Sequence, residues 1–231
     1  YYKSETQFIC YNGKININNL SLFLNMLMCY EAKVINNKKN YVNFETLIEK
    51  CDDIKTLNKY MDTIIEDNKS KKICNDNIKF DDYMNLYYSK KLNITNKIKL
   101  HNISFVYLKT MQWVLLYYKN NTPSSWMWSF NYTFSPFLID ITDYVNKNIY
   151  KLNLSDFEKN APLKQCEQLL YILPKDDILN LMDEKYHEYV SSNEELYGDY
   201  KIDLFNVYNK NKAIVILKNM DIIKIKNYCN K

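Results

Sequence analysis

Residues 107–141 read YLKTMQWVLLYYKNNTPSSWMWSFNYTFSPFLIDI, and they contain all three tryptophans of this 231-residue chain. Before the turn NNTPSS, apolar residues recur at every third or fourth position, which predicts a helix over about 103–119. After the turn, aromatic residues occupy every second position from Trp126 to Phe134. In an extended segment this spacing places the rings on one side, so the sequence predicts an aromatic wall.

Two interpretations of the tryptophans follow from the residues alone. Trp113 lies on or near the apolar face of its helix and is predicted to be a core anchor. Trp126 and Trp128 can also belong to the core. Alternatively, they can stack nucleic-acid bases, because base–aromatic stacking contributes about 1–3 kcal/mol per base and tolerates any sequence. Composition alone favours the core.

Helical periods continue on both sides of this segment. They predict a helix over about 17–31, a regular element beginning at IDITDYV, and a helix in QCEQLLYIL that stops at Pro174. Asp176 is predicted to cap the next helix, at about 178–182. The C-terminal stretch AIVILKNMDIIKIK fits either strand or helix by periodicity.

Residues 33–80 differ from the rest in being rich in lysine, asparagine and aspartate. A weak helical period runs through Phe44, Leu47 and Ile48, and another begins at Leu57 and continues to Ile64. We expect loosely packed helices and a solvated, partly disordered insertion.

The composition restricts the possible functions. A hydrophobic content of 47% is enough for one large domain or two small ones, and a net charge of +4 is too small to indicate a stand-alone nucleic-acid binder. The chain has no arginine, so any phosphate contact must come from lysine, backbone N–H groups or hydroxyls. We find no signal peptide and no apolar run that could span a membrane, and predict an intracellular protein without a membrane partner.

No complete catalytic or metal-binding motif is present. The six cysteines are widely separated and are predicted to be reduced, mostly buried thiols. The sequence lacks GxSxG, HExxH and P-loop motifs, and its acidic pairs, such as Asp52–Asp53, are predicted to be solvated or to cap helices. The sequence therefore predicts no catalytic residue and no metal ligand in this chain.

The ordered motifs YLKTMQWVLLYY, SWMWSFNYTFSPFLIDI and PLKQCEQLLYILP resemble the second conserved region of the Xrn family of 5′→3′ exoribonucleases. The family has Y-V-E-G-L-Q-W-V-L-x-Y-Y-Y, S-W-x-W-Y-Y-x-Y-H-Y-A-P and P-F-x-x-x-x-Q-L-x-x-x-L-P at similar spacing. NGKININNLSLFLNMLMCYE resembles the helix that closes the first conserved region, and YKIDL resembles F-x-I-D-L. The residues on the pattern are Gln112, Trp113, Ser125, Trp126, Trp128, Tyr132, Pro136 and Asp140.

The chain also departs from the family pattern. Lys109 and Thr110 stand where the family has glutamate and glycine, Thr133 replaces a histidine, and the turn before Trp126 is one residue longer. These differences concern the rim of the region.

The resemblance implies a mainly α fold: an irregular helical layer with a few short strands that wraps an N-terminal nuclease domain. It divides the chain into the closing helix (1–32), a divergent insertion (33–80) and the second conserved region (81–231). It also implies Mg²⁺ and catalytic carboxylates outside this chain.

In the function that the resemblance implies, the chain shapes the entrance for single-stranded RNA carrying a 5′-monophosphate. One tryptophan of S-W-x-W then faces the incoming bases, and we favour Trp128 over Trp126. The full-length enzyme is expected in the cytoplasm or nucleus. The alternatives are a non-catalytic RNA-binding or scaffold module of the same fold, and an unrelated helical interaction protein.

Overall fold

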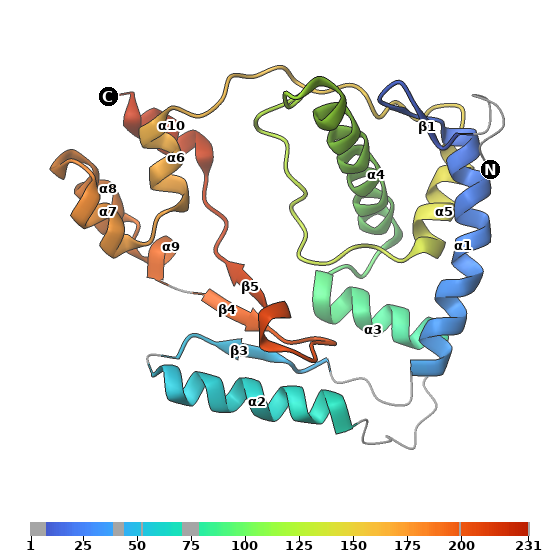
Figure 1. Ribbon diagram of the computed structural model, residues 1–231, viewed down its shortest axis with the longest axis horizontal. Helices are drawn as coiled ribbons and strands as arrows, with labels where there is room; N and C mark the ends of the chain where they lie inside the picture. Colours follow the sequence, from blue (N-terminus) through green and yellow to red (C-terminus); the bar gives the residue numbers. More distant parts are fainter. Residues whose placement is uncertain (1–7, 39–43, 52, 71–78, 199, 231) are drawn as a thin grey trace. The chain divides into compact units, whose positions relative to one another are not determined.

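A computed structural model describes residues 8–38, 44–51, 53–70, 79–198 and 200–230 (Figure 1). Most of the regular structure is helical and the strands are short, which confirms the predicted mainly α class. The chain divides into two compact units. Unit 1 comprises residues 1–44 and 73–161, and unit 2 comprises residues 45–72 and 162–231.

The described residues of unit 1 form four helices. These are α1 (Ile17–Lys38), α3 (Phe80–Leu92), α4 (Lys97–Asn120) and α5 (Leu138–Asn148). In Figure 1, α5 lies between α1 and α4, and both of these helices contact it. The shared core consists of buried aliphatic side chains: Leu20, Leu24, Leu108, Ile141, Val145 and Leu154.

The predicted helices of unit 1 are present and longer than predicted. α1 continues beyond residue 31, to Lys38. α4 begins six residues before the predicted start because the Asn96 side chain accepts a hydrogen bond from the Lys99 N–H at 2.9 Å and so caps the helix. It ends at Asn120, and the following residue, Asn121, has a left-handed φ of 52°, a conformation that asparagine tolerates.

A short hairpin precedes α1. Strands β1 (Cys10–Tyr11) and β2 (Lys14–Ile15) are antiparallel and are joined by Asn12 and Gly13. Both linking residues have positive φ, 50° and 76°, as a tight two-residue hairpin turn requires. The hairpin forms part of unit 1 through contacts between β2 and α4.

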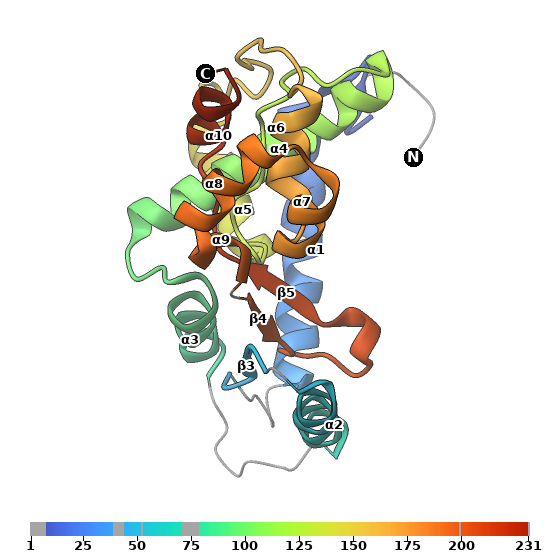
Figure 2. The same cartoon turned by 90° about the vertical axis from the view of Figure 1, so that its left-hand side faces the viewer.

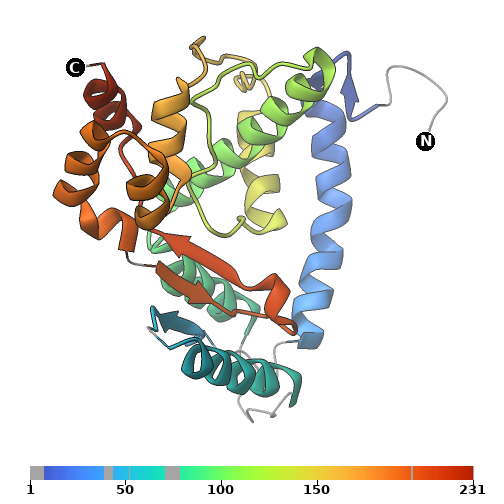
Figure 3. The ribbon, with the colours of Figure 1, turned by 60° about the vertical axis from the view of Figure 1, so that its left-hand side comes forward.

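Unit 2 contains a three-stranded antiparallel sheet in the order β3 (Leu47–Glu49), β4 (Tyr200–Asp203) and β5 (Ile214–Leu217). Helix α2 (Ile54–Ser70) packs Met61 and Ile65 against Ile48 and Ile202 of the sheet. Figure 3 shows α2 running along the sheet. The buried Asn68 amide also donates to the carbonyls of Leu204 and Val207, at 3.0 and 2.8 Å.

Two predictions for residues 33–80 have different outcomes. The period beginning at Leu57 is confirmed, because it lies in α2. The period through Phe44, Leu47 and Ile48 is wrong, because Leu47–Glu49 is a strand. Its pairing with β4, about 150 residues away along the chain, outweighs the weak local period. The polar runs NNKKN and EDNKSKKICNDN lie partly outside the described residues, which omit 39–43 and 71–78.

The remaining helices of unit 2 are α6 (Gln165–Ile172), α7 (Lys175–Leu181), α8 (His187–Ser192), α9 (Glu194–Gly198) and α10 (Ile222–Cys229), with 3₁₀ turns at Glu184–Tyr186 and Lys210–Lys212. α6 and α10 lie side by side (Figures 1 and 2). They share a core centred on Leu170, Ile178 and Ile225.

The structure decides two details at this end of the chain. The cap predicted for Asp176 is wrong: α7 begins at Lys175 after Pro174, and Asp176 lies in the first turn. The ambiguous C-terminal stretch contains both elements, β5 and then α10. Asp221 separates them, because its carboxylate caps α10 by accepting from the N–H groups of Ile223 and Lys224.

The cysteine prediction was partly wrong. All five described cysteines are free thiols, but Cys10 and Cys29 are exposed and Cys51, Cys166 and Cys229 are half-buried. Cys74 lies outside the described residues. Among the helices that the structure describes, none combines the length and apolar character needed to cross a bilayer.

Candidate nucleic-acid interface

Residues 121–137 connect α4 to α5 and carry the predicted site. This loop bends at Trp126–Met127 and again at Thr133–Phe134 and has no strand, so it is not the continuous extended segment on which the predicted aromatic wall depends. Trp128, Phe130 and Tyr132 each contact α4, whereas Phe134 contacts α3. Backbone groups of the loop also bond to side chains of α3, α4 and Asn160.

Trp113 fixes the start of the loop. Its indole Nε1 donates to the Ser125 carbonyl at 2.9 Å, and its ring stacks on Tyr117 of the same helix with centroids 5.8 Å apart. The side chain is half-buried rather than fully enclosed in the core. Trp113 thus anchors the end of the turn by a hydrogen bond as well as by packing.

Gln112 joins α4 to the hairpin. Its side chain is 1% exposed, and its Oε1 accepts from the Ile15 N–H at 2.8 Å. Its Nε2 donates to the Gly13 carbonyl at 2.6 Å. A buried amide with both ends satisfied holds two segments in register, because losing either partner would leave a buried polar group unpaired.

Asn160 holds the backbone of the S-W-M segment. Its Oδ1 accepts from the N–H groups of Trp126 and Met127 at 2.7 and 3.1 Å. Its Nδ2 donates to the hydroxyl of the buried Ser125 at 3.2 Å. One side chain therefore contacts three consecutive residues.

Trp128 lies against α4 and the segment that follows α5. Its Nε1 donates to Thr110 Oγ1 at 3.1 Å, and its ring meets Phe157 edge-on at 5.4 Å. The Lys109 ammonium lies 4.9 Å from the Trp128 ring centroid and 5.1 Å from that of Phe157. This is cation–π geometry. Lys109 therefore fills the space beside the Trp128 and Phe157 rings that an external cation or a base would otherwise enter.

The later rings of the loop have separate partners. Phe130 meets Tyr107 of α4 at 5.6 Å and Tyr132 at 5.5 Å. The Tyr132 hydroxyl accepts from the Asn102 amide at 3.3 Å. Phe134 meets Tyr87 of α3 at 6.2 Å. The rings therefore pin the loop to two helices.

Two tyrosines of α3 fix the end of the loop, where Pro136 is buried. Tyr87 donates its hydroxyl proton to the Ser135 carbonyl at 2.8 Å. The Tyr88 hydroxyl donates to Asp140 Oδ2 at 2.5 Å and accepts from the Phe137 N–H at 2.9 Å. Burial, and then the charge of Asp140, raise the pKa of Tyr88, so its hydroxyl stays protonated and can donate.

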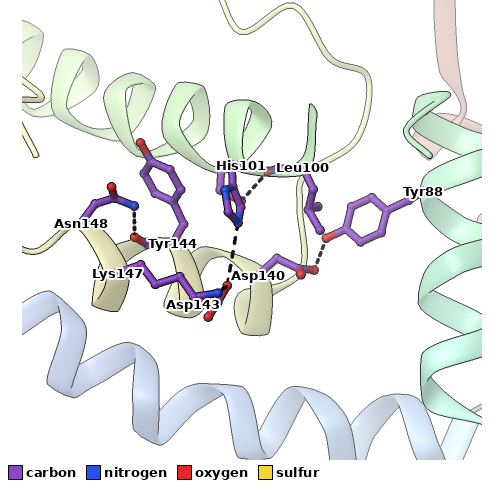
Figure 4. A network of polar contacts seen from close by, with 9 residues as sticks. Tyr88, Leu100, His101, Asp140, Asp143, Tyr144, Lys147 and Asn148 are labelled. Atoms are coloured by element: carbon purple, nitrogen blue, oxygen red, sulfur yellow. Dashed lines mark hydrogen bonds and ion pairs between the residues drawn. The ribbon is translucent and has the colours of Figure 1, made fainter. Parts of the chain in front are cut away.

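Figure 4 shows Tyr88 of α3 reaching Asp140 at the start of α5. Next to it, His101 of α4 lies 4.0 Å from the Asp143 carboxylate, which also pairs with Lys147 at 2.6 Å. Burial raises the pKa of Asp140, while its bond to Tyr88 opposes that rise. The arrangement orients helices by hydrogen bonds.

Glu31 of α1 is a second carboxylate at the start of α5. It accepts from the Ile139 N–H at 3.3 Å, so it satisfies one of the free amides of the first helical turn. Burial raises the pKa of Glu31, opposed by the backbone bonds from Leu138 and Ile139. Like Asp140, this acid therefore has a structural partner.

The structure thus places Gln112 and Trp113 in the C-terminal half of α4, and Ser125, Trp126 and Trp128 in the loop that follows it. Tyr132 continues that loop, whereas Pro136 and Asp140 lie where it joins α3 and α5. Sequence reasoning missed Asn160, Phe157 and the support from Tyr88. Asn160 carries no local signal, because it lies 34 residues after Trp126 in an asparagine-rich chain.

Comparison with known proteins identifies the family. Residues 22–213, well over half the chain, match the family model described as the Xrn1 helical domain. The chain belongs to the Xrn1 helical domain family. The match covers the whole candidate interface, from Gln112 to Asn160.

The relatives are named as exoribonucleases. The chain is 35% identical over 131 residues to the 5′-3′ exoribonuclease 2 of Gibberella zeae, covering 54% of this chain and 13% of that protein. It is 31% identical over 149 residues to human 5′-3′ exoribonuclease 1, covering 62% of this chain and 8% of that protein. The matched region thus spans only about a tenth of these relatives.

The fold and family therefore agree with the sequence motifs. In the part of the chain that the structure describes, no three His, Cys, Asp or Glu side chains are grouped to hold a metal ion.

Proposed function

We propose that this chain is the helical-domain part of a 5′→3′ exoribonuclease and that its S-W-x-W loop shapes the entrance for single-stranded RNA. Trp126 and Trp128 are the proposed contacts with the bases. Gln112, Trp113, Ser125, Tyr132, Pro136 and Asp140 support the loop. Catalytic carboxylates and Mg²⁺ are proposed to belong to an N-terminal nuclease domain of the same protein, which this helical layer wraps.

The observation that carries this proposal is an exposed indole on a tightly held loop. The Trp126 side chain is 47% exposed, whereas its neighbours Ser125 and Trp128 are buried and half-buried. Exposing a tryptophan forfeits the free energy of burying it, and holding its backbone costs conformational entropy. A surface that stacks unpaired bases needs both an exposed ring and a fixed backbone, which would account for these two costs.

The chemistry of the chain suits contact with bases more than with phosphates. No arginine is available for bidentate phosphate binding, and the Lys109 ammonium near the loop already lies against the rings of Phe105, Trp128 and Phe157. Recognition of the RNA 5′-monophosphate is therefore proposed to come from the nuclease domain. The proposed contribution of this chain is to select and position an unpaired strand.

The full-length protein carrying Trp126→Ala and Trp128→Ala tests this proposal. We expect slower decay of 5′-monophosphorylated single-stranded RNA and weaker discrimination against duplex RNA, since stacking of one or two bases is lost. The measurements are decay time courses on matched single-stranded and duplex substrates, together with the thermal midpoint. Unchanged decay and duplex exclusion in a folded variant would refute the proposal.

Tyr118→Ala is a matched control. Tyr118 is a large aromatic at the end of α4 and is highly exposed, but it lies before the loop. We expect its substitution to leave RNA decay unchanged. Full-length protein that binds single-stranded RNA in a salt-dependent way but never degrades it would instead identify a non-catalytic RNA-binding module.

A further inference from the structure

The two tryptophans of the S-W-x-W loop are held in different ways. Trp128 is fixed through its side chain, by Thr110, Phe157 and Lys109. The Trp126 side chain is 47% exposed, so packing alone restricts its ring much less. The direction in which Trp126 points must therefore depend largely on its backbone.

One side chain bonds to the backbone N–H groups on both sides of the Trp126 Cα. Asn160 Oδ1 accepts from both the Trp126 and Met127 N–H groups, at 2.7 and 3.1 Å. Two consecutive N–H groups converge on one oxygen only when the peptide between them is turned, so these bonds select a particular local backbone conformation. The peptide planes on both sides of the Trp126 Cα are thereby defined.

The preceding residue is held from two directions. Asn160 Nδ2 donates to the Ser125 hydroxyl at 3.2 Å, while Trp113 Nε1 donates to the Ser125 carbonyl at 2.9 Å. Ser125 is itself 4% exposed. The residue before Trp126 therefore cannot rotate freely, and Trp126 projects from a segment pinned on either side.

We propose that Asn160 is a positioning residue: it orients the exposed Trp126 indole so that this ring stacks on a base of single-stranded RNA. Trp128 then acts mainly as a support, because its own cation and aromatic neighbours occupy its surroundings. This inference rests on the proposed function, which assigned base contact to both tryptophans. It assigns the base contact to Trp126 in place of Trp128, which the motif had favoured, and adds the residue that orients it.

Three substitutions at Asn160 separate orientation from folding. Asn160→Leu keeps the number and branching of the side-chain heavy atoms and removes both the acceptor and the donor. Asn160→Ala also removes them but lets water reach the freed N–H groups, so it replaces the leucine variant if that protein does not fold. Asn160→Asp keeps an oxygen that can accept from both N–H groups, and the Ser125 hydroxyl can donate to it in turn.

Asn153→Leu is the matched control. Asn153 also accepts a backbone bond, from Ser155 N–H at 3.2 Å, and belongs to the same segment between α5 and α6. It is exposed and lies outside the candidate interface. We expect this variant to behave as the unmodified protein does.

All variants are compared in the full-length protein with a single-stranded 5′-monophosphorylated RNA that contains 2-aminopurine. Its fluorescence falls when the base stacks on an indole, and EDTA keeps the RNA intact during that measurement. Steady-state decay with Mg²⁺ then provides KM and kcat. Measuring at two salt concentrations corrects for the charge that Asn160→Asp introduces.

We expect Asn160→Leu to reproduce Trp126→Ala, with loss of the fluorescence quench. We also expect KM to rise about fivefold with kcat unchanged, because the free energy needed to orient the ring is then taken from RNA binding. Asn160→Asp should restore both values at the higher salt concentration. A merely structural role would instead lower the thermal midpoint without separating KM from kcat.

The results distinguish the inference from the function on which it rests. If Trp126→Ala raises KM but Asn160→Leu and Asn160→Ala do not, the positioning role of Asn160 is wrong and the proposed function stands. The same conclusion follows if Asn160→Asp is as defective as Asn160→Leu. If the double tryptophan variant is unchanged, the proposed function fails and the inference fails with it.

Discussion

The S-W-x-W loop and the sheet of unit 2 are both held by residues far apart along the chain, but the hydrogen bonds that hold them are of different kinds. In the sheet, β4 pairs with β3 and β5 through backbone groups that every residue except proline supplies. In the loop, the backbone bonds of Trp126 and Met127 go to the side chain of one residue, Asn160. The conformation of the loop therefore depends on the identity of residue 160, whereas the sheet depends on which backbone positions are paired.

This difference predicts where substitutions should be costly. A side chain that satisfies buried backbone groups has no replacement when it is changed, whereas an exposed strand residue leaves the ladder intact. The clamp at Gln112, the acid beside the loop and an exposed strand residue are therefore expected to differ in their sensitivity to substitution.

The largest effect is expected for Gln112→Leu. This change leaves the Ile15 N–H and the Gly13 carbonyl without their side-chain partner in a site where Gln112 is 1% exposed. We expect a loss of about 2–4 kcal/mol in the free energy of unfolding. Urea unfolding measures it, and Asn120→Leu at the exposed end of α4 is the control. A loss below that of the control would contradict a side-chain clamp.

A pH-dependent effect of intermediate size is expected for Asp140→Asn. Burial raises the pKa of folded Asp140 above its ordinary value of 3.8, so the folded state holds the proton more tightly than the unfolded state does. Its contribution to stability is therefore fully present below pH 3.8 and is lost as pH rises through the folded pKa.

Asparagine keeps an oxygen for the Tyr88 hydroxyl but does not titrate. Between pH 4 and pH 7 the thermal midpoint of the unmodified protein should fall more steeply than that of the variant. The pKa of Glu31 is also raised, first by burial and in part by the charge of Asp140, so the difference between the two proteins reports Asp140 together with its effect on Glu31. Parallel curves would show that Asp140 does not carry this dependence.

The smallest effect is expected for Val215→Thr in β5. The Val215 side chain is 56% exposed, and its strand is held to β4 by backbone pairing. Threonine is also β-branched, so we expect a change within about 0.5 kcal/mol by urea unfolding. A large loss would break the contrast between side-chain and backbone support, because it would make the sheet as dependent on residue identity as the loop.

Much of the helical structure could be predicted from residues that are close together in the sequence. α1, α4 and α6 follow apolar periods and end near turn-forming residues, so their existence was predicted and only their bounds changed. The candidate interface was accessible through its motif, which placed Trp113, Trp126 and Trp128 together. Its internal geometry was not, since period-two spacing implies a wall only in a strand and this loop is not one.

By itself, the sequence determined the helical periods, the turn after Asn120 and the family motifs, because these depend on neighbours within a few residues. Only the tertiary structure decided that Leu47–Glu49 is a strand, that Asn160 holds Trp126, and that Lys109 lies against Trp128. The first two depend on partners 34 or more residues away. The third depends on the path of the loop, which brings Trp128 back to α4 nineteen residues after Lys109, and no local pattern encodes such a return.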